Sequence, residues 1–518
     1  MYSAEFLTAQ NTLLSVISMT GAWVLYQLFV MLYNLSPLHP LSHIPGPLLA
    51  RASFLPEFYY DFVKYGKYTK QIQRMHDEYG PIIRINPNEV HCNDIEFVDE
   101  IYTTSSRKRN KPLHLIRGVA TQGTAFGTVD HGLHRYRRGP VAKFFSRSMI
   151  AKLENEVHGL AQALCDKLLS SLDDEPFDTV IAYSCFTSDV ISSYCFGESF
   201  GFLDQKGWYP NFHRPEMGVL SPVYAFRFFP FLERIYGLGN YFINYLPEDT
   251  AYLIRTLTVD VPNKVQKAQH EIDSGLTRDR PTVLHHMLQL EIYQKKHLDP
   301  TGEAAALLGA GTVTTSWTLA VITYHLLDKP ELLAKLTQEL EQNIEDPKHL
   351  PPLSVLENLP YLHAVIQEGL RLSYGVSARS SRVPTDEDLV YRGEWEERKV
   401  EHTIPRGYAI GMSCVITHHD ESIFPDSYSF IPERWLDQSS IKKLERGMFA
   451  FSKGSRTCLG VNLAMCELYV GLAALTLRVF PRMQLFDTTE EDVIYDYDMF
   501  IPMPKVDSKG VRVTAVPA

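Results

Sequence analysis

The sequence predicts a mainly α-helical domain with a small β portion, preceded by one N-terminal transmembrane helix. Helical patterns dominate from about residue 146 to residue 343. The run Ile82-Ile83-Arg84-Ile85, followed by Pro87-Asn88 and Val90-His91, is typical of two strands joined by a turn. Between Glu5 and Arg51 there is no Lys, Arg, Asp or Glu. These three observations indicate an anchor, a small β region and a large helical body.

The first 36 residues are predicted to be a membrane anchor, with a helix at about residues 12–32. A helix over this nearly wholly apolar stretch spans about 30 Å, the thickness of a bilayer core. A cleaved signal peptide is the alternative, but it favours basic residues before a shorter apolar run. Only Glu5 precedes the run, whereas Arg51, Lys64, Lys67 and Lys70 follow it. The positive-inside rule therefore predicts a single-pass protein of the endoplasmic reticulum membrane with its catalytic domain in the cytosol.

Residues 37–50 contain Pro37, Pro40, Pro45 and Pro47 and are predicted to form a stiff, extended hinge that cannot continue the helix. Residues 51–518 follow as one large catalytic domain, although a length of 518 residues would also allow three domains.

Composition excludes some classes of protein. A hydrophobic fraction of 45% and a charged fraction of 21% are typical of an ordered globular chain. The net charge of −11 argues against a nucleic-acid partner, because phosphate backbones are bound by clustered Lys and Arg. The seven cysteines form no CxxC pair, so we expect reduced thiols that are mostly small core residues.

Two consecutive helices are predicted in the C-terminal half. The stretch from Ala304 to Leu327 is long and apolar, and Asp328-Lys329-Pro330 ends it. Pro330 opens a second, amphipathic helix from Glu331 to Glu341. We expect the first helix to run through the middle of the domain, since a long apolar helix must be buried.

The most specific motif is Phe451-Ser-Lys-Gly454-Ser-Arg456-Thr-Cys458-Leu-Gly460. A buried structural cysteine near a turn is the alternative interpretation of Cys458. The segment resembles the cysteine-ligand loop of the cytochrome P450 family at every fixed position. The resemblance implies the cytochrome P450 fold, haem b as the cofactor and Cys458 as the ligand of its iron. It also implies that the glycines let the backbone approach the porphyrin and that Arg456 pairs with a propionate. The helix from Asn462 to Leu475 would offer its N-terminal dipole to the thiolate.

A second motif is Glu368-Gly369-Leu370-Arg371, on a helix predicted from Pro360 to Leu372. Taken alone, Glu368 and Arg371 would be a surface ion pair. The segment Pro432-Glu433-Arg434-Trp435 changes this interpretation, because the pair of motifs resembles the structural triad of the same family. The resemblance implies that Glu368, Arg371 and Arg434 brace the haem-side core and take no part in catalysis.

A third motif is Ala310-Gly311-Thr312-Val313-Thr314-Thr315, in the long apolar helix. In the alternative interpretation, its threonine hydroxyls only donate hydrogen bonds to backbone carbonyls one turn earlier. The segment resembles the family's oxygen-activation motif, which implies that Ala310 and Gly311 leave room over the iron. The same resemblance implies that Thr314 helps to deliver protons. Val313 departs from the family, where an acidic residue usually precedes the threonine, so water, Thr315 or a substrate hydroxyl would have to replace it.

Further residues follow from the same resemblance. His134 and Arg138 would contact a haem propionate, and so would Arg382, for which Arg379 could substitute. Substrate would touch residues 116–126, Leu307, Thr315 and residues 376–378. Five basic residues would ring the cysteine side and suit an acidic electron donor, namely Lys143, Lys442, Lys443, Arg446 and Lys453.

The runs Thr417-His418-His419-Asp420-Glu421 and Arg107-Lys108-Arg109 look most like fungal members of secondary metabolism, of the trichodiene-oxygenase-like type. The resemblance implies a monooxygenase that inserts one oxygen atom from O2 into a lipophilic substrate, a terpenoid or other secondary metabolite. Electrons would come from an NADPH-cytochrome P450 reductase, with cytochrome b5 as a second candidate donor. The alternatives are an isomerase, dehydratase or peroxide-using enzyme of the same fold, and a membrane-tethered scaffold without haem.

Overall fold

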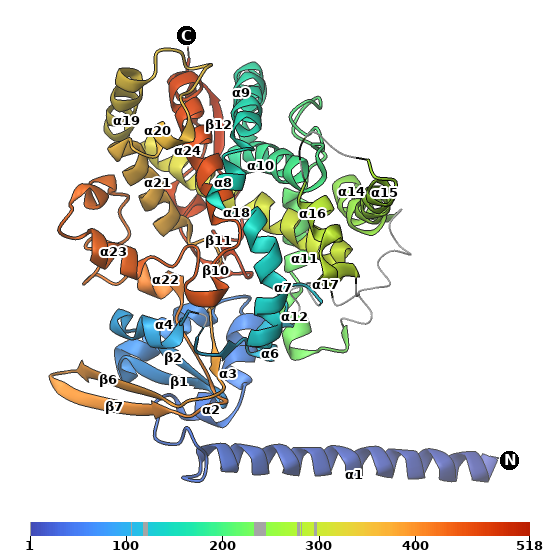
Figure 1. Cartoon of the computed structure of the whole chain (residues 1–518). Coiled ribbons are helices and arrows are strands. Elements are labelled where there is room, and N and C mark those ends of the chain that lie inside the picture. Colours follow the sequence, from blue (N-terminus) through green and yellow to red (C-terminus); the bar gives the residue numbers. More distant parts are fainter. Residues whose placement is uncertain are drawn as a thin grey trace.

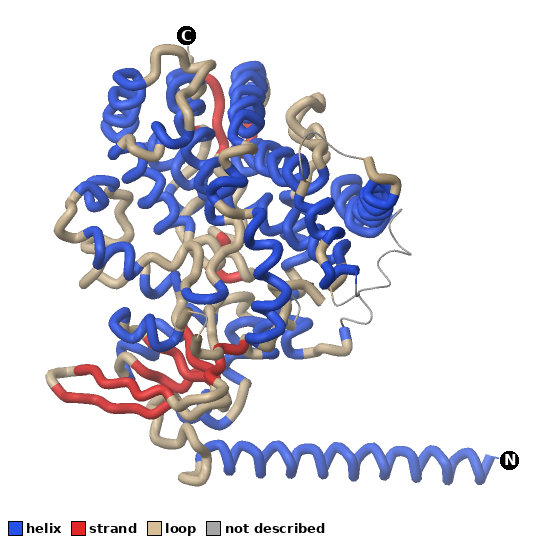
Figure 2. Tube along the Cα trace, in the orientation of Figure 1, coloured by secondary structure: helices blue, strands red, loops and turns tan. Residues whose placement is uncertain are grey.

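The computed structural model describes residues 2–104, 106–117, 123–232, 245–276, 280, 282–294 and 298–517. It is 56% helical and 9% strand, which confirms the predicted mainly α class with a small β portion. Figure 2 shows most of the strands gathered at one end of the body, with the helices above them.

Helix α1 (Tyr2–Leu35) projects from the β-rich end of the body (Figure 1). It is longer at both ends than the predicted 12–32. Within it, Leu14–Leu35 is apolar and long enough to cross a membrane, and none of that window is buried. Helices α18 (Pro300–Asp328) and α24 (Val461–Arg478) also have the length and apolarity, but they are 61% and 67% buried inside the body. Burial therefore distinguishes α1, which fits a membrane anchor, from two core helices.

The segment after α1 differs from the extended hinge predicted for residues 37–50. Residues 36–44 form turns, with backbone bonds from His39 to Ser36 and from Ser42 to His39. Leu41 and Ile44 are fully buried, and Arg84 donates to the backbone oxygen of Asn34. Proline blocks helix continuation here but leaves neighbouring carbonyls free to accept turn bonds, so the segment packs onto the body.

The remaining elements of the body follow in chain order. The helices before α18 are α2 (Leu48–Ala52), α3 (Leu55–Glu57), η1 (Phe58–Val63), α4 (Tyr68–Tyr79), η2 (Ile95–Phe97), α5 (Val98–Ile101), α6 (Leu113–Ile116), α7 (His131–Phe144), α8 (Arg147–Ile150), α9 (Glu154–Ser171), α10 (Thr179–Phe196), α11 (His213–Leu220), α12 (Val223–Phe228), α14 (Glu248–Arg255), η4 (Thr256–Asp260), α15 (Val261–Asp273), α16 (Val283–Gln289) and α17 (Glu291–Gln294).

The helices after α18 are α19 (Pro330–Asn343), α20 (Leu353–Leu356), α21 (Pro360–Ser373), α22 (Cys414–Thr417), η5 (Pro432–Leu436), α23 (Ile441–Gly447), η6 (Gly454–Arg456), α24, η7 (Phe480–Arg482) and η8 (Glu490–Asp492). The strands are β1 (Ile82–Asn86), β2 (Glu89–Cys92), β3 (Arg109–Asn110), β4 (Phe177–Asp178), β5 (Val383–Pro384), β6 (Leu389–Trp395), β7 (Arg398–Ile404), β8 (Ala409–Gly411), β9 (Met483–Leu485), β10 (Tyr497–Asp498), β11 (Pro502–Met503) and β12 (Arg512–Ala515).

The predicted strand pair is confirmed as β1 and β2, which are antiparallel with Ile83 opposite His91. Strand β8 joins them in parallel, with Val90 opposite Ile410, to give the order β1-β2-β8. Every residue of β1 and β2 is buried, so both faces of this small sheet are covered. The sheet ties the N-terminal region to residues 409–411. A second sheet has the order β4-β12-β9 and joins the start of α10 to the C-terminus.

The core centres on α18, as predicted for the long apolar helix. Helix α10 packs along it, and all residues of α10 are buried. Helix α21 packs against α18 from another side, where Gly369 faces Ile322. A Cβ at Gly369 would lie only 2.2 Å from the Ile322 Cγ1 atom. The absence of a side chain at Gly369 therefore sets the approach of the helix that carries Glu368 and Arg371.

The substitution Gly369→Ala should lower the free energy of unfolding by about 1–3 kcal/mol, the usual effect of overpacking a dense core. Adding Ile322→Ala should recover part of that loss. Gly159→Ala on α9 is the matched control, because no atom lies within 4 Å of its added Cβ, and it should not destabilise the chain. Urea unfolding curves measure all four proteins. Equal effects of the two glycine substitutions would contradict this account of the packing.

Candidate functional site

The loop before α24 is closed by its own backbone. The Cys458 N–H donates to the Phe451 carbonyl at 2.8 Å, and the Thr457 hydroxyl donates to the same oxygen at 3.1 Å. Cys458 is exposed, whereas the other six cysteines of the chain are buried. The cysteine with the predicted chemical role is therefore held in a rigid turn, and its side chain is accessible.

Gly454 brings this loop against residues 102 and 103. Its φ is +72°, a left-handed value that favours glycine. A Cβ there would lie 2.5 Å from the Tyr102 carbonyl oxygen, and the next residue, Ser455, donates its N–H to the Thr103 carbonyl at 2.9 Å. Gly454 thus allows a close approach of two chain segments, a requirement that is separate from the predicted approach to a porphyrin.

Opposing electrostatic effects act on the pKa of the Cys458 thiol. The side chain keeps access to solvent, but desolvation by the surrounding protein raises its pKa, whereas the Gly460 N–H and the Arg138 guanidinium lower it. Gly460 immediately precedes α24, so its N–H belongs to the helix start that was predicted to favour the thiolate. The predicted effect of the helix start is present, but desolvation outweighs it and leaves the pKa above its usual value.

The predicted triad forms around the buried carboxylate of Glu368. Arg371 donates to it twice, from Nε at 2.9 Å and from Nη2 at 2.8 Å. Arg434 Nε donates at 3.1 Å, Trp435 Nε1 at 2.9 Å and the Ile431 backbone N–H at 2.9 Å. Burial raises the pKa of Glu368, but the two arginines outweigh it and hold the pKa below its usual value. The ion pair is therefore a buried brace, which excludes the surface interpretation.

Arg371 extends this brace toward the cysteine loop through His418. The Arg371 guanidinium donates to the His418 carbonyl at 2.9 Å, and His418 Nδ1 contacts the Arg371 carbonyl at 2.7 Å. His418 Nε2 accepts the Phe449 N–H at 2.8 Å, two residues before Phe451. Burial lowers the pKa of His418 to about 3, so the ring is neutral, with a proton on Nδ1 and an acceptor at Nε2. This tautomer satisfies both contacts.

Five basic residues gather near the cysteine loop. They are Lys111, His134, Arg138, Arg382 and Arg456, and within the described ranges none forms an ion pair with a carboxylate. Burial and the neighbouring cations lower the pKa of Arg456 to about 9 and that of His134 to about 2. They hold the pKa of Lys111 well below its usual range. A cluster of this kind needs an anionic partner.

The polar atoms of the cluster are only partly used. Arg456 donates to the carbonyls of Thr128 and Val129, both at 2.7 Å, while its Nε is buried without a partner. His134 Nδ1 is likewise buried without a partner. Two propionates, each an anionic acceptor, match this set of unpaired donors and positive charge. The residues present therefore fit the haem implied by the resemblance.

Lys111 was not predicted from the sequence. Its ammonium group donates to the Phe126 carbonyl at 2.8 Å and lies 3.6 Å from the centroid of the Phe126 ring. Among many basic residues, nothing in its local sequence marks it. Its position beside Arg382 and Arg456 depends on contacts between segments far apart in the chain.

Arg379 is engaged elsewhere, so the alternative that it substitutes for Arg382 is not supported. Its guanidinium contacts Glu57 at 2.5 Å and Glu89 at 3.0 Å and lies 3.7 Å from Asp61. Arg227 on α12 also pairs with Asp61, at 3.0 Å. All these side chains are buried. Three buried carboxylates hold Arg379, whereas among the described residues Arg382 contacts backbone carbonyls, Ser452 and the Tyr102 ring, and no carboxylate.

Replacing Arg382 and Arg379 by Gln should have different effects. Arg382→Gln should speed haem loss to apomyoglobin by roughly 10- to 100-fold, the value of one charge-assisted hydrogen bond, with little change in unfolding. Arg379→Gln should lower the free energy of unfolding by about 3–5 kcal/mol, because it leaves the buried Glu89 without a counter-charge and leaves Glu57 and Asp61 to share Arg227. A larger effect of Arg379→Gln than of Arg382→Gln on haem retention in folded protein would reverse the assignment.

The oxygen-activation segment presents one open face. Ala310 is exposed and Thr314 is half-buried one turn later, with its hydroxyl donating to the Ala310 carbonyl at 3.0 Å. Gly311 faces α10, where a Cβ would lie 2.8 Å from Ile191. Gly311 therefore serves helix packing, and its predicted role in leaving room over iron stays a prediction.

Thr315 is buried, and its side chain is hydrogen-bonded to Glu467 on α24. The Glu467 carboxyl is fully enclosed, and burial raises its pKa well above the usual range. Glu467 was not predicted from the sequence, although a lone carboxylate in the apolar run of α24 is a usable signal. Thr315 thus joins α18 to α24, and it does not line the cavity that Thr314 reaches.

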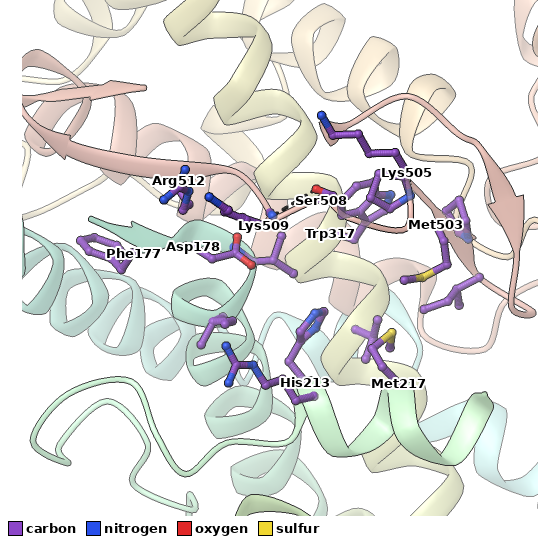
Figure 3. Close-up of a pocket in the computed structure, with 18 of the residues that line it drawn as sticks. Phe177, Asp178, His213, Met217, Trp317, Met503, Lys505, Ser508, Lys509 and Arg512 are labelled. Atoms are coloured by element: carbon purple, nitrogen blue, oxygen red, sulfur yellow. Dashed lines mark hydrogen bonds between the residues drawn. The ribbon is translucent and has the colours of Figure 1, made fainter. Parts of the chain in front are cut away.

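A cavity of about 580 Å³ borders Val313 and Thr314. Figure 3 shows Trp317 of α18 facing His213 and Met217 of α11, with Asp178, Lys509 and Arg512 on one side and Lys505 on the other. Of the predicted substrate contacts, residues 118–122 lie outside the described residues, and neither Leu307 nor residues 376–378 line this cavity. Apart from Val313, Thr314 and the rest of α18, its walls come from segments that no sequence motif marked.

Comparisons with known proteins all point to the same family. The Cytochrome P450 family model matches residues 54–494. Cytochrome P450 monooxygenase ppzE of Metarhizium majus is 39% identical over 445 residues, covering 82% of this chain and 92% of that protein. N-acetyltryptophan 6-hydroxylase ivoC of Emericella nidulans is 35% identical, covering 95% and 97%. Tryptophan 6-hydroxylase fscE of Fusarium equiseti is 35% identical, covering 92% of each.

Proposed function

Because this chain belongs to the cytochrome P450 family and is a monooxygenase, we propose that Cys458 is the iron ligand through which it inserts one oxygen atom into a lipophilic substrate. The observation that carries the assignment is the closed Cys458 loop, in which Gly460 and Arg138 favour a thiolate while the other six cysteines are buried. Cys458 would hold the haem through its thiolate, and the bound haem would supply the activation of O2.

The protein's own residues hold and orient this cofactor. Arg382, Arg456, His134, Arg138 and Lys111 would bind the propionates, since their positive charges have no carboxylate partner in the described chain. Thr314 would hold a proton at its Oγ1 atom on the open face of α18. The brace formed by Glu368, Arg371 and Arg434 fixes the loop from the other side.

A secondary metabolite is the proposed substrate, a terpenoid or an aromatic compound. Two relatives carry the names N-acetyltryptophan 6-hydroxylase and tryptophan 6-hydroxylase, which supports ring hydroxylation as one chemistry within this group. Val313 favours a second candidate, a peroxide-using enzyme, because a buried valine replaces the acidic residue that usually precedes the threonine.

An NADPH-cytochrome P450 reductase at the endoplasmic reticulum is the proposed electron donor, with cytochrome b5 as a second donor, and α1 would hold the domain on the cytosolic side. Lys453, five residues before Cys458, donates to the Glu445 carbonyl, so α23 lies beside the cysteine loop. Helix α23 exposes Lys442 and Lys443. These lysines could receive an acidic surface of the reductase.

An NADPH-cytochrome P450 reductase should reduce the ferric protein, with the rate followed as formation of the carbon monoxide complex. The double variant Lys442→Glu and Lys443→Glu should slow reduction by about tenfold at low salt, because steering by charge raises association rates. Lys399→Glu, in the distant hairpin of β6 and β7, should leave the rate unchanged. If the reductase gives no reduction of folded, haem-loaded protein, the peroxide-using alternative replaces the proposal.

A further inference from the structure

The cavity beside Thr314 has an unusual distribution of charge for the pocket of an enzyme acting on lipophilic substrates. Its walls include four basic side chains, Arg214, Lys505, Lys509 and Arg512, and only one carboxyl, Asp178. Near α18 the lining is apolar or uncharged. At about 580 Å³ the cavity has the size of a site for a small organic molecule.

Asp178 does little to offset these positive charges. Its carboxylate accepts the backbone N–H groups of Val180 at 3.0 Å and Val511 at 3.1 Å. It lies directly under Gly510, where a Cβ would be 2.1 Å from its Oδ2 atom. Burial raises the pKa of Asp178 to about 7, despite the two N–H groups and the nearby Arg214 and Arg512. The carboxyl is therefore satisfied by backbone, and a large fraction of it is uncharged near neutral pH.

Arg214 is the basic residue with most freedom to bind a ligand. Its guanidinium lies 4.6 Å from the centroid of the Tyr209 ring, and it makes no ion pair within the described part of the chain. It follows His213, the first residue of α11, whose side chain points toward Trp317 in Figure 3. An Arg guanidinium held by an aromatic ring is well suited to bidentate binding of a carboxylate.

The other three basic side chains already have carboxylate partners. Lys505 is 3.3 Å from the exposed Glu491 and 3.9 Å from the buried Asp492, Lys509 is 3.8 Å from Asp487, and Arg512 also pairs with Asp487. Within the described part of the chain, Arg214 is therefore the cation of the lining that is left for an anionic ligand.

The lining also includes apolar side chains. Val313 of α18, Met217 and Ile501 line the cavity together with Thr314. A molecule whose anionic group lies at Arg214 can therefore place an apolar body against α18 near Thr314.

We propose that the substrate is an organic acid, whose carboxylate is bound by Arg214 while its apolar body extends along α18 to Thr314. This inference rests on the proposed function, because it assigns the open face of α18 to the reacting part of the substrate. Arg214 is a specificity-determining residue, remote from the atoms that react.

The test compares a matched pair of probes, naphthylacetic acid and naphthylacetamide, which differ in charge and hardly in shape. Binding to the haem-loaded full chain is measured by equilibrium dialysis and by the shift of the haem Soret band. The wild-type protein should bind the acid at least tenfold more tightly than the amide, and added salt should weaken only the acid. The acid should also shift the Soret band, since its ring would reach the haem side of α18.

Single substitutions test which residue is responsible for the preference for the acid. Arg214→Gln should weaken the acid by about tenfold and leave the amide unchanged, as expected for the loss of a charge-assisted hydrogen bond. Lys505→Gln, on the other side of the cavity in Figure 3, should weaken the acid by less than Arg214→Gln. Arg398→Gln, which removes an exposed charge from β7 away from the cavity, should change neither affinity.

Equal affinity for acid and amide, equal losses in Arg214→Gln and Arg398→Gln, or binding of the acid without a Soret shift would overturn the inference. The carbon monoxide spectrum of the same samples separates the two proposals. A thiolate-type band with no preference for the acid rejects only the substrate class, whereas loss of that band rejects the proposed function.

Discussion

The buried carboxylate of Glu368 is the interaction on which the rest of the site depends. It accepts hydrogen bonds from Arg371, Arg434, Trp435 and the backbone of Ile431, and so joins α21 to η5. A buried carboxylate without these donors would strongly destabilise the fold. From Arg371 the bonding continues through neutral His418 to the backbone of Phe449, just before the cysteine loop. The position of Cys458 is therefore fixed from the protein core and not by its local turn alone.

Two groups of positively charged side chains lie near the cysteine loop, and they differ in whether carboxylates neutralise them. Arg379 is neutralised by Glu57, Asp61 and Glu89, and this buried network holds the N-terminal region to residues 379–382. The second group, around Arg382 and Arg456, has no carboxylate partner among the described residues, and its pKa values are lowered by burial and mutual repulsion. A folded protein retains such a cluster at a cost in stability, which points to an anionic partner that binds there.

The sequence predicted features whose signal is local. The strands β1 and β2, the helices α18, α19, α21 and α24, and the cysteine loop lie close to their predicted positions, because periodicity, proline and glycine act over a few residues. Contacts between segments far apart in the chain could not be predicted from the sequence. Such contacts hold residues 36–44 against the body and place Arg379 in a network apart from Arg382. They also pack Gly311 against Ile191 and bring Thr315 to Glu467. Lys111 and the cavity at Arg214 have the same origin, since each depends on segments brought together only by the fold.

The central claim is that Cys458 is the ligand of the haem iron, and the ferrous carbon monoxide difference spectrum tests it most directly. The wild-type protein and Cys466→Ala, a substitution of a buried cysteine on α24, should both give the red-shifted band of thiolate ligation. Folded Cys458→Ser should lack that band. A thiolate-type band that persists in Cys458→Ser would contradict the account, because another residue would then hold the iron.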